Sequence, residues 1–351
     1  MSIDTAYEQA LDLLQALIAI PSYSREENAT ADLLVNWFAA RGITCSRKGN
    51  NVWAQYIFSP GQETLLLCSH HDTVRPAAGY TKHPFSPFIE EGRLYGLGSN
   101  DAGASLVAMA ATFLYLVQRG AARYNLVFAA VAEEETSGNG GISLLLPELP
   151  QLHCALVGEP TMMQMAVAER GLLVLDCTSC GVAGHAARNE GESALYKAVV
   201  AIQQLQELHF EKVSELLGAV SLNVTGIQTE NKAHNVVPDR CTFMVDVRVN
   251  ELYTHEAVLD RIRQTIDAEV QPRSLRLRSS MIPLKHELVQ KGLSMGMGYY
   301  GSPTLSDKAL MPFPALKLGP GDSARSHTAD EFVYLQEIRQ GIEGYIELIK
   351  R

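Results

Sequence analysis

Hydrophobic residues recur at two spacings along the first half of the chain, and these spacings predict helices interleaved with strands. Apolar positions three or four residues apart predict amphipathic helices, whereas short apolar runs between turn residues predict buried strands. The first helix stops before Pro21 and the second before Gly42, as helices commonly do. The predicted helices cover residues 5–20, 28–41, 102–119 and 141–146, and the predicted strands cover 64–68, 125–132 and 154–157. This alternation favours an α/β sheet covered by helices on both faces.

The pattern changes near residue 172, where strands and helices follow in the order β-α-β-β-α-β. The predicted strands cover 172–180, 219–227, 240–249 and 273–279, and the predicted helices cover 192–208 and 254–270. The residues expected to face inward are Cys241, Phe243, Val245 and Val247 in the third strand, and Leu195, Val199, Ile202 and Leu205 in the first helix. This order is that of a ferredoxin-like α+β unit.

A helix at 286–295 and a strand at 315–318 then return to the first pattern. We therefore predict two domains, because 351 residues exceed what one core usually organises. The first is a three-layer α/β/α domain of residues 1–170 and 281–351. The second is an inserted ferredoxin-like domain of residues 171–280.

Composition narrows the possible functions. Hydrophobic content of 46% and charged content of 19% are typical of a globular enzyme. A net charge of −10 and the lack of a basic run argue against nucleic-acid binding. No apolar stretch reaches the roughly eighteen residues of a membrane span, and the first residues lack the basic and apolar regions of a signal peptide. We therefore expect a cytoplasmic protein that binds neither nucleic acid nor membrane.

The six scattered cysteines, including the Cys177–Cys180 pair, are expected to be reduced thiols in apolar surroundings.

Six residues with metal-binding side chains stand in short segments marked by Gly or Pro, mostly after strand-like runs. They are His70, Asp101, Glu134, Glu135, Glu159 and His327. Imidazole nitrogens and carboxylate oxygens are ligands of zinc, and open α/β sheets place ligand sites beyond the carboxyl ends of their strands. Two histidines and four acids are too many for one catalytic zinc. They suit two metals that share a bridging carboxylate, with one glutamate left as a base. The sequence therefore indicates a metallohydrolase.

Each segment has a simpler interpretation when it is taken alone. Asp101 could cap the helix that follows it, and the acidic run 133–135 could be a solvated loop. Around His70, alternate residues of an extended segment point the same way, so Asp72 is expected to orient the His70 imidazole while His71 packs elsewhere. The recurrence of such segments at successive strand ends favours one shared metal site.

These motifs, in this order, resemble the acetylornithine deacetylase / succinyl-diaminopimelate desuccinylase family, a group of co-catalytic zinc hydrolases that includes aminoacylases and glutamate carboxypeptidases. The resemblance extends over essentially the whole chain. The matching motifs lie at 69–74, 98–103, 134–135, 158–161 and 319–327. Two positions depart from the family pattern: Ser69 replaces a Gly, and Asn100-Asp101-Ala102-Gly103 replaces D-M-K-G, which removes a Lys beside Asp101.

The resemblance implies a zinc-peptidase fold for the first domain and a role for each candidate residue. Asp101 would bridge two divalent metal ions, which the family implies to be zinc, with cobalt as an alternative. His70 and Glu159 would complete one metal site, and Glu135 and His327 the other. Glu134 would act as the general base, and Asp72 would orient His70.

The inserted domain resembles the lid and dimerisation domain of the same family, so the resemblance implies a homodimer. His185 matches the histidine of a G-x-x-x-H-A motif that reaches the active site of the partner subunit. Asn235 matches the asparagine of N-V-I-P and Arg248 the arginine of D-x-R, both implied to contact substrate; a turn asparagine and a surface arginine are the simpler alternatives. Arg325 is a further candidate contact for a substrate carboxylate.

Within the family, the E-E-T-S segment at 134–137 and the G-E-P-T segment at 158–161 favour an N-acylated ornithine as substrate. We expect hydrolysis of the amide of a small N-acyl amino acid, N2-acetyl-L-ornithine to L-ornithine and acetate, in arginine biosynthesis. N-acetylcitrulline, N-succinylornithine, succinyl-diaminopimelate and dipeptides are alternative substrates. A non-catalytic metal-binding relative is the alternative from a different class, and the presence of Glu134 and His185 argues against it.

Overall fold

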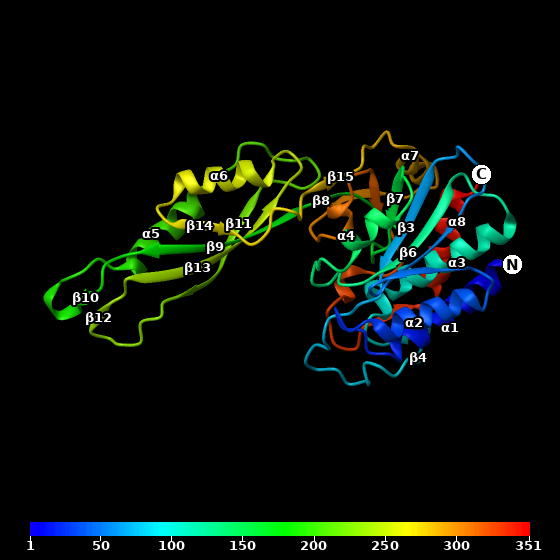
Figure 1. The fold of residues 1–351 in the computed structure, drawn as a ribbon, viewed down its shortest axis with the longest axis horizontal. Coiled ribbons are helices and arrows are strands. Elements are labelled where there is room, and N and C mark those ends of the chain that lie inside the picture. Colours follow the sequence, from blue (N-terminus) through cyan, green and yellow to red (C-terminus); the bar gives the residue numbers. More distant parts are fainter. The chain divides into compact units, whose positions relative to one another are not determined.

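The computed structural model describes residues 1–351, and the chain divides into two compact units (Figure 1). Unit 1 contains Met1–Val167, Ile282–Tyr300 and Ser306–Arg351, and unit 2 contains Ala168–Met281 and Gly301–Leu305. The predicted domain boundaries at 170/171 and 280/281 lie within three residues of the main unit boundaries. The short segment Gly301–Leu305 differs, because it was predicted in the first domain and belongs to unit 2.

Unit 1 is built on a mixed sheet with the strand order β1-β2-β6-β3-β7-β17-β8. Its strands are β1 (Ser46–Lys48), β2 (Asn51–Tyr56), β3 (Thr64–His70), β6 (Asn125–Val131), β7 (Cys154–Val157), β17 (Ala315–Lys317) and β8 (Met165–Glu169). β3 pairs in parallel with both β6 and β7, and β17 pairs in parallel with β7. These four strands are buried along their whole length, as expected of strands covered on both faces. Their carboxyl ends therefore meet at one edge of the sheet.

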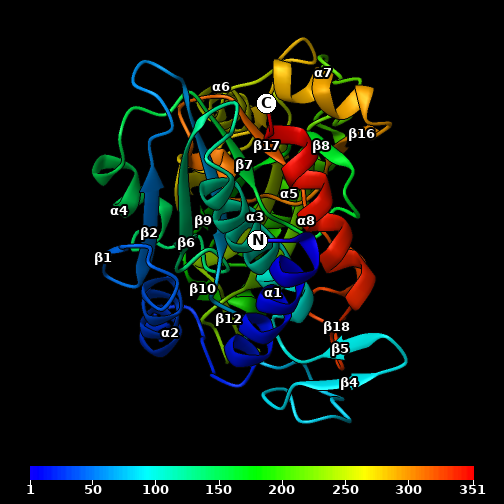
Figure 2. The same ribbon diagram turned by 90° about the vertical axis from the view of Figure 1, so that its right-hand side faces the viewer.

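Helices cover both faces of this sheet, which confirms the predicted three-layer α/β/α class. One face carries α1 (Ile3–Ile18), α2 (Asn28–Ala39), α3 (Ala104–Arg119) and α8 (Leu335–Ile349), with α7 (Glu287–Ser294) packed on α8 (Figure 2). Three buried aromatic rings join this layer to the sheet: Phe38 lies 5.1 Å from Phe128 and 6.2 Å from Phe113, centroid to centroid. The other face packs against the short helix α4 (Ile142–Leu145) and the adjoining loops.

The start of α3 differs from the prediction. The helix begins at Ala104 rather than 102, after a π-helical turn at Ser99–Gly103. Asp101 lies in this turn with φ −115° and ψ 100°, so it does not cap α3. The segment Ser99–Arg119 is long and apolar enough to cross a membrane, yet 83% of its most apolar window is buried inside the protein, as in a core helix.

Several short strands were not predicted. β18 (Phe332–Tyr334), β5 (Arg93–Tyr95) and β4 (Phe88–Glu90) form a three-stranded sheet in that order. β16 (Tyr299–Ser302) pairs with β8, and β15 (Ser280–Met281) pairs with the last residues of β8. All five lie in connections that sequence patterning assigns to loops, because strands of two to four residues are too short to show an alternation.

Unit 2 has the predicted ferredoxin-like order. Its antiparallel sheet has the strand order β11-β13-β9-β14, formed by β11 (Ser221–Gln228), β13 (Arg240–Val249), β9 (Gly171–Cys180) and β14 (Glu269–Pro272). Helices α5 (Ala194–Glu207) and α6 (His255–Thr265) pack on one face of this sheet (Figure 1). A two-stranded ribbon of β10 (Gly184–His185) and β12 (Val236–Val237) extends from the end of β9 and β13. The four alternating residues predicted to face inward in β13 are all buried.

Two predictions in unit 2 are wrong in detail. The buried face of α5 is formed by Ala194, Ala198, Ala201 and Leu205, and the predicted core residue Val199 is 41% exposed. Small alanines let the helix approach the sheet closely, which a pattern weighted towards large residues misses. The helix predicted at 254–270 ends at Thr265, and the strand predicted at 273–279 lies instead at Glu269–Pro272. Ile262, Ile266 and Val270 are all buried and follow one another at intervals of four residues. This spacing is typical of a helix, so the sequence pattern predicts a helix beyond the point where the strand begins.

Candidate active site

The six residues predicted for the metal site and its base, together with Asp72, all lie in unit 1. They lie near the carboxyl ends of its parallel strands. His70 is the last residue of β3, and Glu134 and Glu135 follow the end of β6. Glu159 follows β7, and His327 lies in the loop after β17. Because these strands are neighbours in the sheet, the fold brings together side chains that are far apart in the sequence.

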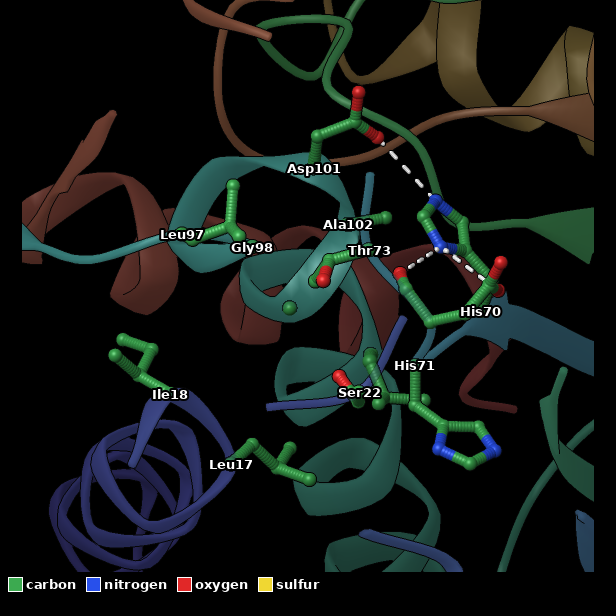
Figure 3. A pocket seen from close by; sticks show the side chains of 13 residues that line it. Leu17, Ile18, Ser22, His70, His71, Thr73, Leu97, Gly98, Asp101 and Ala102 are labelled. Atoms are coloured by element: carbon green, nitrogen blue, oxygen red, sulfur yellow. Dashed lines mark hydrogen bonds and ion pairs between the residues drawn. The ribbon is translucent and has the colours of Figure 1, made fainter. Parts of the chain in front are cut away.

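Asp101 lies between the two predicted histidine ligands. His70 Nε2 is 3.3 Å from Asp101 Oδ1 (Figure 3), and His327 Nε2 is 3.6 Å from Asp101 Oδ2. Each oxygen of one carboxylate therefore faces a different imidazole. A carboxylate that bridges two metal ions requires this arrangement.

The remaining predicted ligands complete two groups that share Asp101. One group is His70, Asp101 and Glu159, and the other is Asp101, Glu135 and His327; within each, the ligand atoms lie within 4.8 Å of one another. Glu159 Oε1 is 3.9 Å from His70 Nε2, and Glu135 Oε2 is 3.0 Å from His327 Nε2. The structure thus assembles the five predicted ligands into the two predicted sets.

The electrostatics of the acids fit a site built for cations. Loss of solvent raises the pKa of Glu134 well above its usual range, and the charge of Glu159 adds to this effect. Burial also raises the pKa of Glu159 to about 8, with a further contribution from Asp101. Crowded carboxylates of this kind repel one another unless a positive charge compensates them. Divalent metal ions held by these nitrogen and oxygen donors would supply that charge.

Asp72 contacts His70 as predicted, and its backbone carbonyl makes the closer contact. His70 Nδ1 lies 3.0 Å from the backbone carbonyl oxygen of Asp72 and 3.6 Å from its carboxylate, so the carbonyl accepts the shorter hydrogen bond. This bond places the proton on Nδ1 and leaves Nε2 free to bind a metal. The carboxylate accepts hydrogen bonds from the backbone N–H groups of Glu134 (3.1 Å) and Glu135 (3.2 Å) and from the Ser24 hydroxyl (2.6 Å). It therefore holds the loop that carries the predicted base.

His71 packs away from the site, as predicted. Its Nδ1 lies 2.9 Å from the Thr30 hydroxyl and its Nε2 lies 3.0 Å from the Asn50 carbonyl oxygen. Burial lowers its pKa, which favours the neutral imidazole.

Sequence reasoning missed two residues that hold the Asp101 loop. The Glu331 carboxylate, 2% exposed, accepts hydrogen bonds from the backbone N–H groups of Gly98, Asn100 and Asp101, each at 2.9 Å. The Asn100 side chain donates to the Asp322 carbonyl oxygen at 3.0 Å and accepts from the Asp322 N–H at 3.0 Å. No sequence signal distinguishes Glu331 from the adjacent Asp330, because both are acids in a loop.

A small cavity of about 20 Å³ lies behind His70 and Asp101 (Figure 3). The apolar part of its wall includes Leu17, Ile18 and Leu97. This volume has room for about one water molecule, so it is too small for an amino-acid substrate.

The three candidate residues of unit 2 do not form one cluster. His185 and Asn235 lie together, because His185 pairs with Val236 across the β10–β12 ribbon and the Ala186 N–H donates to the Asn235 carbonyl oxygen. Arg248 lies eight residues along β13 from Arg240, about 26 Å at the usual strand rise. Its guanidinium binds both oxygens of Asp246, at 2.8 and 3.0 Å. Within unit 2, Arg248 and Asn235 therefore cannot contact one small substrate.

Arg325 also differs from the predicted substrate contact. Its guanidinium nitrogens lie 2.9 and 2.6 Å from the two carboxylate oxygens of Glu337 in the first turn of α8. It also donates to the Phe332 carbonyl oxygen at 3.3 Å. The arginine side chain is only 14% exposed, so this ion pair anchors the His327 loop to the helix and leaves no free charge for a substrate carboxylate.

Comparison with solved structures identifies the same fold in several peptidases. Aminopeptidase PepT from Bacillus cereus superposes with a TM-score of 0.80 at 17% identity, covering 97% of each chain. A tripeptidase from Staphylococcus aureus superposes with a TM-score of 0.79 at 20% identity, covering 98% of each chain. A Bacillus subtilis protein described as a dinuclear metal-binding peptidase superposes with a TM-score of 0.75 at 15% identity, again covering 98% of each chain.

At the level of sequence, residues 66–351 match the family described as Peptidase family M20/M25/M40. This range includes every residue of the two candidate metal groups and the whole of unit 2. The chain belongs to the peptidase family M20/M25/M40.

Proposed function

We propose that this chain is a two-metal amidohydrolase that removes the acyl group from a small N-acyl amino acid. The observation that carries the proposal is the position of Asp101, whose two oxygens face His70 and His327 separately. Glu134 lies on the loop that also carries the predicted ligand Glu135, which places an acid without a ligand role beside the metal groups. Two divalent ions, zinc or cobalt, would be held by the two groups that share Asp101.

When bound, such ions would polarise the scissile carbonyl and lower the pKa of a water molecule towards about 7. Glu134 takes a proton from the attacking water and later gives a proton to the leaving amine nitrogen as the C–N bond breaks. The products are a carboxylate and a free α-amino acid.

Unit 2 is proposed to act as a lid and dimerisation domain, with His185 completing the active site of the partner subunit in a homodimer. The exposed position of His185 on the β10–β12 ribbon supports this role, since the side chain is available to a second chain. A donor to the carbonyl oxygen that gains charge in the reaction contributes roughly 3–4 kcal/mol to such catalysis. Asn235, beside His185 on the same ribbon, is the associated substrate contact.

The proposed substrate is N2-acetyl-L-ornithine, which would place the enzyme in cytoplasmic arginine biosynthesis. The E-E-T-S and G-E-P-T segments support an acylated ornithine, and N-acetylcitrulline, N-succinylornithine and succinyl-diaminopimelate share the same scissile amide. Dipeptide hydrolysis is the second candidate function. The name of the family and the tripeptidase with the same fold favour it.

One experiment separates these candidates. The purified protein, loaded with zinc or cobalt, is given each acyl amino acid and a panel of dipeptides at equal concentration, and kcat/KM is measured for each. The proposal predicts the largest kcat/KM for acetylornithine. A larger value for any dipeptide would favour the peptidase function, and two bound metals without hydrolysis of any amide would indicate a non-catalytic metal-binding protein.

A further inference from the structure

We propose that Glu331 is a positioning residue that fixes the bridging carboxylate of Asp101 and thereby sets the affinity of both metal sites. The proposal rests on the two-metal centre described above. It concerns a residue that is neither a predicted ligand nor the predicted base.

The first argument is the number of hydrogen bonds that converge on one carboxylate. Glu331 Oε1 accepts from the N–H groups of Asn100 and Asp101, and Oε2 accepts from the N–H of Gly98, all at 2.9 Å. These N–H groups precede α3 in a turn where no strand or helix partner satisfies them. A buried N–H group without an acceptor destabilises the folded chain, so the carboxylate stabilises this conformation of the loop.

The second argument is that Glu331 belongs to the same loop as the ligand His327. Asn100 joins the two loops a second time through its paired hydrogen bonds with the Asp322 backbone. The loop of the bridging ligand and the loop of His327 therefore form one hydrogen-bonded assembly. Because Asp101 belongs to both metal groups, loss of the Glu331 hydrogen bonds to its loop would change both groups and not one alone.

The third argument is the choice of a carboxylate at this position. The carboxyl group of Glu331 offers two acceptor oxygens, which together match the three N–H donors. The amide of Glu331→Gln would place a donor against at least one of these N–H groups. The alanine of Glu331→Ala would leave all three without an acceptor. We therefore expect the alanine variant to disturb the loop more than the glutamine variant.

Asn125 provides a matched control in the same unit. Its buried side chain accepts from the N–H groups of Phe58 and Ser59 and donates to the carbonyl oxygens of Ser59 and Gln62. Asn125 is the first residue of β6, at the opposite end of the strand from the metal groups. Asn125→Ala therefore removes a comparable set of buried backbone hydrogen bonds without touching the Asp101 loop.

The test measures the dissociation constants of Zn²⁺ in the metal-free full-length proteins by competition with a chromophoric chelator, with Co²⁺ spectra as a report on ligand geometry. Circular dichroism establishes that each variant is folded. Substitution of a residue that supports a metal ligand by hydrogen bonds commonly lowers the affinity for the metal about 10- to 100-fold. We expect Glu331→Ala to weaken both sites by at least about tenfold, Glu331→Gln to weaken them less, and Asn125→Ala to leave both unchanged.

Unchanged dissociation constants in folded Glu331→Ala would overturn the proposal. If that variant does not fold, unchanged constants in folded Glu331→Gln would do the same. An equal loss of affinity in Asn125→Ala would also overturn it, because the effect would then reflect general stability. If the wild-type protein itself bound no divalent metal, the two-metal centre would fail together with the proposal, and that result is distinct from a failure of Glu331 alone.

Discussion

The Asp72 carboxylate accepts a hydrogen bond from the backbone N–H of Glu134 at 3.1 Å, while the Asp72 carbonyl oxygen lies 3.0 Å from His70 Nδ1. One residue thus orients a predicted ligand with its main chain and holds the loop of the predicted base with its side chain. A change in the side chain should therefore affect Glu134 and Glu135 more directly than His70.

Asp72→Asn tests this division. The amide can accept from fewer N–H groups than the carboxylate, so the loop at Glu134 and Glu135 should loosen. We expect kcat to fall about 10- to 100-fold with a smaller loss of metal affinity, measured by steady-state kinetics and metal titration. Ser24→Ala is the matched control, because it removes one donor to Asp72 and leaves both backbone contacts in place. A larger loss of kcat in Ser24→Ala than in Asp72→Asn would contradict the assignment.

Glu134→Gln should abolish proton transfer but keep both metal ions. The amide has nearly the same shape as the acid and cannot accept the proton of the attacking water. General acid–base groups commonly contribute about 10²- to 10⁴-fold to the rate, so kcat should fall by that factor while the bound metal per chain stays at the wild-type value. Normal turnover with both metals bound would show that another group is the base.

Complementation between two inactive variants tests whether His185 acts on the partner subunit. In mixed dimers of His185→Ala and Glu134→Gln chains, one of the two active sites would combine an intact Glu134 with an intact His185 from the other chain. Random exchange at equal concentrations should restore about a quarter of the wild-type activity. No recovery in mixed dimers detected by differential tags would exclude action in trans.

Metal affinity should increase with pH between about 7 and 9. The hydrogen bond to Glu135 raises the pKa of His327 to about 9, so this imidazole is protonated at pH 7 in the chain alone. A metal can bind only after the proton leaves, so protons compete with the metal below the folded-state pKa and no longer compete above it. Calorimetry at pH 7 in buffers of different ionisation enthalpy should show protons released as metal binds. A pH-independent affinity over this range would contradict the prediction.

Phe128→Ala should destabilise unit 1 without changing the chemistry of the site. Phe128 is fully buried and lies between Phe38 and Phe113, with centroids 5.1 and 6.2 Å away. Truncation of a buried Phe costs about 3–5 kcal/mol, and Phe128→Leu should cost clearly less. Urea unfolding followed by circular dichroism measures the loss. Metal affinity under native conditions should stay within about twofold of wild type, since Phe128 contacts none of the ligands.

The sequence was sufficient to predict the elements on which the site is built. The buried runs 65–68, 126–132 and 154–157 in and beside β3, β6 and β7 are continuous and apolar, and a candidate ligand follows each run within three residues. Chemistry at the ends of parallel strands could therefore be predicted from the order of segments alone. The division of His70, Glu135, Glu159 and His327 into two groups that share Asp101 was predicted from the family resemblance.

Other features depend on contacts between distant segments and could not be predicted. Glu331 is distinguished only by the N–H groups of a turn more than two hundred residues earlier in the chain. Arg325 became a candidate for substrate binding because its partner Glu337 has no sequence signal. The face that α5 buries consists mainly of alanines, and a search for large apolar residues at helical spacing does not find it.

The positions of the predicted ligands along the chain limit the order in which metal ions can bind during synthesis of the protein. The predicted ligands His70, Asp101 and Glu159 are all synthesised before unit 2, whereas His327 and Glu331 are synthesised after it. At that stage all three residues of the first metal group have been made, but the second group still lacks His327. The Asp101 loop also still lacks the Glu331 carboxylate that accepts its hydrogen bonds. The second site can therefore be filled only after residue 327 has been made, and a chain cut short before this residue cannot hold both ions in the proposed way.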